Sequence, residues 1–274
     1  MTIKDTIRKY TNELKLVTHI PAKEVEILML HLLEKNTIWL HLNYNVEFEK
    51  EKELEVLVKK RATNYPLEYI INKASFYGEM FIVKEGVLIP RPETEILVEN
   101  AIEILKDKKE IKVLEIGTGS GIISVMLAML IENIKIIAVD INEKALDLAK
   151  QNAIKHGVEN KIEFRLSNLY ENVNETDIFM TISNPPYIAN NYILPTNVKY
   201  EPSNALFGGV VGDELLKDII KATSEKKIPY LLCEMGYDQK TPLENYFKEF
   251  NVESYSFYKD YESFDRGFTL KFKN

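Results

Sequence analysis

Apolar residues recur at helical spacing in the first 73 residues of the chain. Ile7, Tyr10 and Leu14 lie three or four positions apart, and a second set with this spacing follows Pro21. Such spacing places side chains on one face of a helix, and proline suits a helix's first turn. Residues 1–73 are therefore predicted to form a small helical bundle that serves packing or partner binding and has no chemistry of its own.

The pattern changes near residue 74. Two β-rich runs, residues 75–78 and 80–83, flank a turn and predict a β-hairpin that joins two domains. A helix is expected from about residue 94 to residue 106. The predicted domains are a helical domain at 1–73, a hairpin linker at 74–90 and a larger domain at 91–274.

Apolar strands alternate with amphipathic helices after residue 112, which is typical of an α/β fold built on a mainly parallel sheet. The last two strands have only a short link and should pair antiparallel. The clearest helices span residues 121–131 and 143–156. The expected strands are residues 112–117, 134–140, 161–166, 177–183, 229–234, 252–258 and 268–272.

Charge is unevenly distributed along the chain, whose formal net charge is −7. Residues 1–73 hold 12 basic against 11 acidic side chains, and the remainder holds 23 against 31. A phosphate backbone is normally bound by a basic surface. The acidic larger part therefore argues against a nucleic-acid partner.

The cysteine, the histidines and the apolar segments exclude further classes of protein and of site. The single Cys233 lies in an apolar run, as expected of a buried core residue, and the four histidines show no ligand spacing, so no metal site is expected. The first residues lack the apolar core of a signal peptide, and the apolar stretch 122–131 is too short to span a bilayer. We expect a cytoplasmic protein that does not contact membranes.

A glycine-rich turn follows the strand at 112–117 and opens the next helix. Gly117, Gly119 and Gly121 permit a tight turn and a close approach of a ligand to the backbone. Asp140 ends the next strand, where a carboxylate can accept hydrogen bonds from a ribose. Ligands of open α/β sheets bind beyond the carboxyl ends of the strands, so these features predict one nucleotide-like site.

Two ligand classes fit this site, a dinucleotide and S-adenosylmethionine. The third glycine comes one residue too early for the dinucleotide pattern. Glu115, just before the glycines, could meet the amino-acid part of S-adenosylmethionine. The competing interpretations are a solvent-facing strand-end charge for Glu115 and a helix-capping neighbour for Asp140.

Residues Asn184-Pro185-Pro186-Tyr187 follow the predicted strand 177–183. Consecutive prolines cannot continue a central strand because they lack an N–H group. The result is a stiff turn with an amide on one side and an aromatic ring on the other, which suits a planar polar substrate group. An inert strand-end turn is the alternative.

Together these motifs resemble class I S-adenosylmethionine-dependent methyltransferases that act on planar nitrogens, with a Rossmann-like sheet of seven mixed strands. Residues 89–95 (Ile-Pro-Arg-Pro-Glu-Thr-Glu) resemble a signature of the peptide chain release factor glutamine methyltransferases, the PrmC/HemK family. The resemblance covers nearly the whole chain, including the helical N-terminal part. Further matches occur at residues 66–70, 76–78, 200–209, 234–239 and 260–266.

The resemblance implies methyl transfer from S-adenosylmethionine to the glutamine amide in the Gly-Gly-Gln motif of class 1 release factors, in translation termination, with the helical domain binding the release factor. Methylation of a ribosomal-protein glutamine, a nucleic-acid amino-methyltransferase and a cofactor-binding module without catalysis remain alternatives. Two departures stand out, because the family commonly has Asp at Glu115 and at Asn168.

The resemblance also implies site residues. The Asn184 side-chain oxygen and the Pro185 carbonyl would accept both amide hydrogens of the substrate glutamine, while Pro186 and Tyr187 would pack around it. Weaker candidates that line the site are Arg91, Pro92, Glu93 and Thr94. Cofactor contacts are expected at Glu115, Gly117, Thr118, Gly119, Ser120, Gly121, Asp140, Ile141, Asn168, Leu169 and Asn184.

Overall fold

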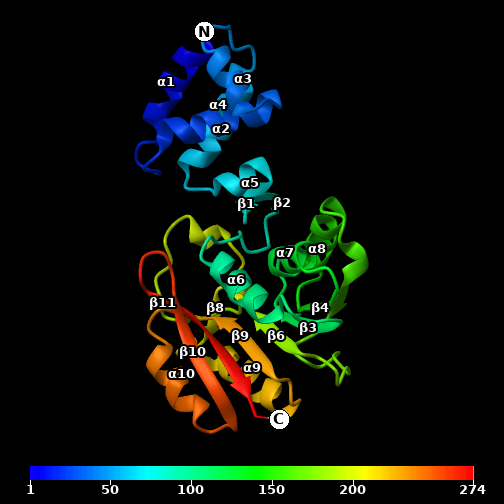
Figure 1. The fold of residues 1–274 in the computed structure, drawn as a ribbon. Coiled ribbons are helices and arrows are strands. Elements are labelled where there is room, and N and C mark those ends of the chain that lie inside the picture. Colours follow the sequence, from blue (N-terminus) through cyan, green and yellow to red (C-terminus); the bar gives the residue numbers. More distant parts are fainter. Residues whose placement is uncertain (274) are drawn as a thin grey trace. The chain divides into compact units, whose positions relative to one another are not determined.

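The computed structural model describes residues 1–273, which form two compact units (Figure 1). One unit consists of residues 1–73 together with residues 194–200, and the other of residues 74–193 and the chain from 201 onward. The segment 194–200 thus belongs to the first unit although it is far from it in sequence. Each unit has its own buried core.

The first unit is helical, as its apolar spacing predicts. Tyr10, Leu28 and Leu54 are fully buried where the helices meet. Glu24 and Arg61 form a buried ion pair with an Oε2–Nε distance of 2.6 Å. The helices are α1 (Ile3–Leu14), α2 (Pro21–Leu33), α3 (Thr37–Leu42), α4 (Glu51–Ala62) and α5 (Leu67–Ile71), with a 3-10 turn at Val198–Tyr200.

A seven-stranded mixed sheet forms the centre of the second unit, in the order β10-β11-β9-β6-β3-β4-β5. Strands β3 to β6 and β9 run parallel, whereas β11 pairs antiparallel with both β9 and β10. The strands are β3 (Ile111–Ile116), β4 (Ile134–Asp140), β5 (Ile162–Leu166), β6 (Met180–Ser183), β9 (Tyr230–Glu234), β10 (Val252–Lys259) and β11 (Asp265–Phe272).

Helices cover both faces of this sheet, so its central strands are apolar on both sides. Successive strand residues point to opposite faces: Val113 packs with α6, α7 and α8, whereas Leu114 packs with α9 and α10. Cys233 is fully buried in the second of these cores, as expected. The helices are α6 (Thr94–Leu105), α7 (Ile122–Leu130), α8 (Glu143–Lys155), α9 (Glu214–Glu225) and α10 (Lys240–Phe247).

Short elements complete the second unit. The expected hairpin consists of β1 (Lys73–Phe76) and β2 (Glu79–Ile82), which form a two-stranded sheet. A parallel pair that the sequence pattern did not predict, β7 (Ile188–Ala189) and β8 (Phe207–Gly209), follows the Asn-Pro-Pro-Tyr turn. Two 3-10 turns lie at Glu159–Lys161 and Ser203–Ala205.

Most predicted elements agree with the structure to within one residue, with three larger differences. The β-rich run expected at 75–78 is displaced by two residues, because β1 ends at Phe76 and Tyr77 and Gly78 form the turn. The strand expected at 177–183 forms its ladder only from Met180, and before that Phe179 N donates a single backbone hydrogen bond to Lys112 O (2.9 Å). The last strand begins at Asp265 instead of residue 268, because an irregularity in the ladder lets Lys259 pair with Asp265. The ends of a strand depend on which neighbouring strands pair with it, and local sequence does not specify those neighbours.

Within residues 1–273, no three or more His, Cys, Asp or Glu side chains are grouped so as to hold a metal ion. Over the same residues, no helix has the length and apolar character needed to cross a membrane.

Candidate active site

The glycine loop and the Asn-Pro-Pro-Tyr turn lie next to each other at the carboxyl edge of the sheet. The chain runs from β3 outward to β4 and β5 and then returns to the other side of β3 as β6. Ligands of open α/β sheets bind where strand order reverses in this way. Ile116 pairs with Ser183 at this point, so the segments that follow both residues start side by side.

The glycine loop has a backbone that favours glycine. Gly117, Gly119 and Gly121 all have positive φ angles, between 56° and 82°. Residues other than glycine rarely adopt such angles. A Cβ atom at Gly117 or Gly119 would enter open space, whereas one at Gly121 would lie 2.9 Å from Ala149 Cβ. The first two glycines therefore form an open cradle, and the third lets α8 pack closely.

Glu115 is buried at the base of this cradle, contrary to the solvent-facing alternative. Its Oε2 accepts hydrogen bonds from Thr118 (2.8 Å) and from both the hydroxyl and the backbone N–H of Ser124. Its Oε1 has no hydrogen-bond partner among residues 1–273, and burial raises the pKa of this carboxyl to about 7. A buried carboxylate oxygen without a partner favours a cationic or N–H ligand group. The ammonium group of a bound amino-acid moiety fits this requirement.

Asp140 is held rigidly beside the same loop. Its Oδ2 accepts from Gly119 N–H and its Oδ1 from Asn142 N–H, both at 2.9 Å. Burial raises the pKa of Asp140. Because backbone donors fix its orientation, this carboxylate can serve as an acceptor for a ribose diol.

Two cavities collect most of the predicted cofactor residues. One is lined by Glu115, Thr118 and Ser120, with Arg91 and Thr94 from the segment around the start of α6. The other has apolar walls that suit an adenine ring. The residues lining this second cavity include Leu88, Ile116, Asp140, Ile141, Asn168, Leu169, Pro186 and Leu215. Gly117, Gly119 and Asn184 line both cavities.

Five predicted site residues line neither cavity: Gly121, Pro92, Glu93, Pro185 and Tyr187. Gly121 packs against Ala149 in α8. Pro92 and Glu93 belong to the turn that opens α6, where their carbonyl groups accept from Glu95 and Ile96. Asn168 is exposed and donates from Nδ2 to Glu171, so its oxygen remains available to a ligand. Gly121, Pro92 and Glu93 therefore shape the site and do not line its cavities.

The Asn-Pro-Pro-Tyr turn is held in place from two sides. The side chain of Gln239 donates from Nε2 to the Tyr187 carbonyl (2.9 Å) and accepts from Gly236 N–H. Strand β7, directly after the turn, pairs with β8. The turn is therefore a rigid part of the second unit and not a free loop.

Side chains of this turn connect to a buried carboxylate. Asn184 Nδ2 donates to Thr94 Oγ1 (3.0 Å), and Thr94 Oγ1 donates to Glu234 Oε2 (2.7 Å). Tyr187 donates its hydroxyl proton to the other oxygen, Glu234 Oε1 (2.9 Å). Three segments that are far apart in sequence thus meet at Glu234.

A second carboxylate anchors the wall of the site. Glu201 is buried and accepts from the backbone N–H of Ile89 (3.0 Å) and from the guanidinium of Arg91. Leu88, which precedes these residues, lines both cavities. Glu201 therefore holds the segment that forms one side of the cavities.

Sequence reasoning gave no role to three of these residues, Glu201, Glu234 and Gln239. Glu234 carried a usable signal, because a charged residue follows the apolar run Tyr230–Cys233 at the carboxyl end of a predicted strand. Functional residues gather at such ends in α/β folds. The other two had no comparable signal apart from family resemblance.

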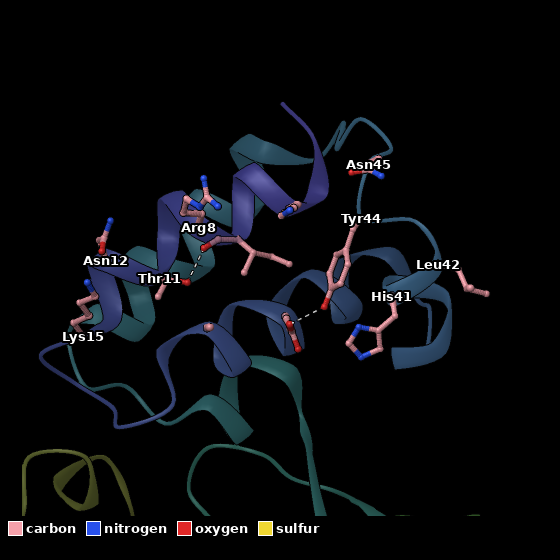
Figure 2. A pocket seen from close by; sticks show the side chains of 12 residues that line it. Arg8, Thr11, Asn12, Lys15, His41, Leu42, Tyr44 and Asn45 are labelled. Carbon is pink, nitrogen blue, oxygen red and sulfur yellow. Dashed lines mark hydrogen bonds between the residues drawn. The ribbon is translucent and has the colours of Figure 1, made fainter.

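The helical unit has a cavity of its own, lined by residues of α1, α2 and α3 and the turn after α3 (Figure 2). Arg8, Asn12 and Lys15 extend along α1 on one side, and Tyr44 and His41 lie on the other. Tyr44 donates to Glu26. Lys4 adds a third cationic side chain to the lining.

The fold, the open glycine cradle and the carboxylates of Glu115 and Asp140 beside it are those of a class I S-adenosylmethionine-dependent methyltransferase. Comparison with protein families agrees with this class. Residues 93–198 match the methyltransferase small domain, and residues 5–71 match the PrmC N-terminal domain.

Relatives place the chain in a particular family. The release factor glutamine methyltransferase of Aquifex aeolicus is 34% identical over 96% of this chain and 93% of its own length. That of Fusobacterium nucleatum is 36% identical over 90% of this chain and 72% of its own length. The chain belongs to the release factor glutamine methyltransferase family.

Solved structures share the fold at much lower identity. The N-terminal domain of human METTL16 in complex with SAH matches with a TM-score of 0.52 and 17% identity, over 90% of this chain and 94% of that domain. The METTL16 catalytic domain with an RNA hairpin from MAT2A matches with a TM-score of 0.56 and 15% identity, over 69% of this chain and 74% of its own.

Proposed function

We propose that this protein methylates the side-chain amide nitrogen of the glutamine in the Gly-Gly-Gln motif of class 1 peptide chain release factors, in the cytoplasm. The observation that carries the proposal is the match to release factor glutamine methyltransferases along nearly the whole chain. The rigid amide-and-ring turn beside the cofactor cradle supports the same chemistry.

We expect carboxylates and apolar side chains around the glycine cradle to hold the cofactor. Glu115 Oε1 would receive the ammonium group, Asp140 would receive the ribose, and Ile141 and Leu169 would flank the adenine. Glu115 has one methylene more than the Asp common in the family, and its Oε2 is used by Thr118 and Ser124. The longer side chain is therefore anchored at one oxygen and free at the other.

The substrate amide would be bound by acceptors of the turn. Asn184 donates from its nitrogen to Thr94, which leaves Oδ1 as an acceptor. With the Pro185 carbonyl, Oδ1 would bind both hydrogens of the glutamine NH2 group. An amide nitrogen is a poor nucleophile because its lone pair is delocalised into the carbonyl group. Acceptors that gain strength as positive charge develops on this nitrogen favour the transition state over the ground state.

S-adenosylmethionine, when bound, supplies a methyl group on a positively charged sulfur. In the overall reaction a carbon–sulfur bond breaks, a carbon–nitrogen bond forms and the nitrogen loses one proton to water. Tyr187, fixed by Glu234, would pack on the amide plane and limit its rotation. Such positioning for in-line transfer accounts for a large part of the expected acceleration.

Methyl transfer from labelled S-adenosylmethionine to a purified release factor tests this proposal. We expect label in the wild-type release factor and none in a version whose Gly-Gly-Gln glutamine is replaced by alanine. Asn184→Ala should reduce transfer at least about 100-fold while the far-ultraviolet circular dichroism spectrum stays unchanged. Transfer to DNA or to a ribosomal protein, but never to a release factor, would overturn the proposal.

We also propose that the helical unit binds the release factor. Its cavity presents the exposed cations Lys4, Arg8 and Lys15 beside Tyr44, which suits an acidic protein surface. Arg8→Glu should raise KM for the release factor and leave kcat unchanged. Lys52→Glu, an equal charge change at an exposed position of α4 outside this cavity, is the matched control. Equal KM values for both variants would contradict this role.

A further inference from the structure

The carboxylate of Glu234 lies at the carboxyl end of β9, next to the end of β6. Its residue is 1% exposed, and each of its oxygens accepts a hydroxyl proton, one from Thr94 and one from Tyr187. A carboxylate can only accept hydrogen bonds. Both hydroxyl protons are therefore directed toward Glu234.

This arrangement determines which end of the Asn184 amide faces the substrate. The Thr94 hydroxyl has one proton, and that proton is used by Glu234. Only lone pairs remain on Thr94 Oγ1, so its hydrogen bond with Asn184 requires an N–H donor, which is Nδ2. The opposite end of the amide, Oδ1, is then the group available to a ligand.

We propose that Glu234 is a positioning residue that, through Thr94, orients the Asn184 amide as an acceptor and thereby selects glutamine over glutamate. The inference rests on the proposed function and goes beyond it by naming the group that gives Asn184 its orientation. In a flipped amide, Nδ2 would face the substrate NH2 group, and two donors would oppose each other. One transition-state hydrogen bond would be lost, and a glutamate carboxylate would be accepted more readily.

Some of the groups around Glu234 favour its charged form and others oppose it. Burial raises the pKa of Glu234, and the hydrogen bonds from Thr94 and Tyr187, together with the positive charge of Arg266, oppose that rise. Arg266 is itself bound to Asp260 through Nε (3.0 Å) and Nη2 (2.8 Å). The nearby carboxylate of Glu93 also raises this pKa.

Glu234→Gln tests the inference with almost no change in shape. The new amide can donate to Thr94, which frees the hydroxyl proton of Thr94 to bond with a flipped Asn184. We expect kcat for the release factor to fall about 10- to 100-fold, the effect of one or two transition-state hydrogen bonds. The dissociation constant of S-adenosylmethionine, measured by calorimetry, should change less than about twofold.

Variants of Thr94 test the relay independently and replace Glu234→Gln if that variant fails to fold. Thr94→Val removes the hydroxyl and should lower kcat as much as Glu234→Gln does, whereas Thr94→Ser should retain near wild-type kcat. Thr223→Val is the matched control, because Thr223 is also a buried helical threonine but bonds to Tyr170. That control should leave kcat unchanged.

Discrimination between substrate side chains gives a readout that a structural role alone would not change. Release factors with Glu or Ala at the acceptor position serve as inhibitors. For the wild-type enzyme, the Glu version should bind more weakly than the Ala version, because Asn184 Oδ1 and the Pro185 carbonyl repel a carboxylate. In Glu234→Gln and Thr94→Val this ratio of inhibition constants should shrink at least about threefold.

The outcomes separate this inference from the proposed function. If the wild-type enzyme does not methylate release factors, the proposed function is wrong. If it does, and both Glu234→Gln and Thr94→Val keep the wild-type kcat and the wild-type ratio of inhibition constants, the positioning role is wrong.

Discussion

The hydroxyl of Ser183 donates a hydrogen bond of 2.7 Å to the main-chain carbonyl of Ile116. This contact joins the last residue of β6 to the last residue of β3. It therefore connects the strand that precedes the Asn-Pro-Pro-Tyr turn with the strand that precedes the glycine loop, at the point where both segments leave the sheet.

Replacing Ser183 by alanine should loosen this connection. Ser183 is fully buried, so the variant leaves the Ile116 carbonyl without this partner. We expect about 1–2 kcal/mol less free energy of unfolding and a lower kcat, measured by urea denaturation and by methyl transfer. Ser254→Ala, at an exposed position of β10, should change neither quantity.

Cofactor affinity should depend on pH through Glu115. The pKa of Glu115 is raised to about 7 by burial, so the carboxyl loses its charge as the pH falls below that value. Because the charged form is the one that attracts an ammonium group, the dissociation constant of S-adenosylmethionine should rise about tenfold between pH 8 and pH 6. Calorimetry across this range measures the change.

Glu115→Gln is the control for this dependence. The variant should bind the cofactor more weakly at pH 8, with an affinity that hardly changes down to pH 6. A slope that persists in Glu115→Gln would instead assign the effect to Asp140, whose pKa is also raised by burial.

Stability of the ligand-free protein should show the opposite trend with pH. Glu115 binds a proton more tightly in the folded state (pKa about 7) than in the unfolded state (4.5). Its contribution is therefore fully present below pH 4.5 and is lost as the pH rises through 7, by about 3 kcal/mol in total. Denaturant unfolding of wild type and Glu115→Gln at pH 5 and pH 8 measures the difference, which should be smaller in the variant.

The third glycine of the loop should tolerate substitution least. Gly121→Ala combines a φ of +82° with a Cβ position 2.9 Å from Ala149 Cβ. Gly78 has a similar φ of +79° with nothing within 4 Å, so Gly78→Ala measures the backbone cost alone, about 1 kcal/mol. We expect Gly121→Ala to lose at least about 1 kcal/mol more than this control. Equal losses would mean that α8 adjusts freely.

Replacing Glu201 should weaken cofactor binding indirectly, through the segment that Glu201 holds in place. Glu201→Ala leaves Ile89 N–H and Arg91 without this buried acceptor. The segment with Leu88 should then be less ordered, and cofactor affinity should fall about tenfold. Glu163→Ala, which removes an exposed partner of Arg165 on β5, should leave the affinity unchanged.

Local patterns were enough to predict the order of elements and the fold class. Apolar positions at helical spacing indicated α1 and α2, and apolar strands before the glycine turn and before Asn184 indicated β3 and β6. The chemistry could be predicted because the glycine loop and the proline turn are each a short continuous stretch of sequence. The short β7–β8 pair was missed, since two or three residues do not make a recognisable strand pattern.

Long-range contacts were not predictable in the same way. Thr94 was a weak candidate and Glu234 had no role, yet together they hold Asn184 and Tyr187. Nothing in the local sequence indicates that these four residues meet, because the start of α6, the end of β6 and the end of β9 come together only once the strand order is known.

The sequence by itself determined most of the elements, the glycine cradle, the Asn-Pro-Pro-Tyr turn and the family, because each depends on residues that are close along the chain. Tertiary structure alone decided that Glu115 Oε1 is buried without a partner, that Glu201 anchors Arg91 and that Glu234 orients Asn184. The physical reason is the return of the chain across β3, which sets strand order and thereby the neighbours of every side chain at the carboxyl edge of the sheet.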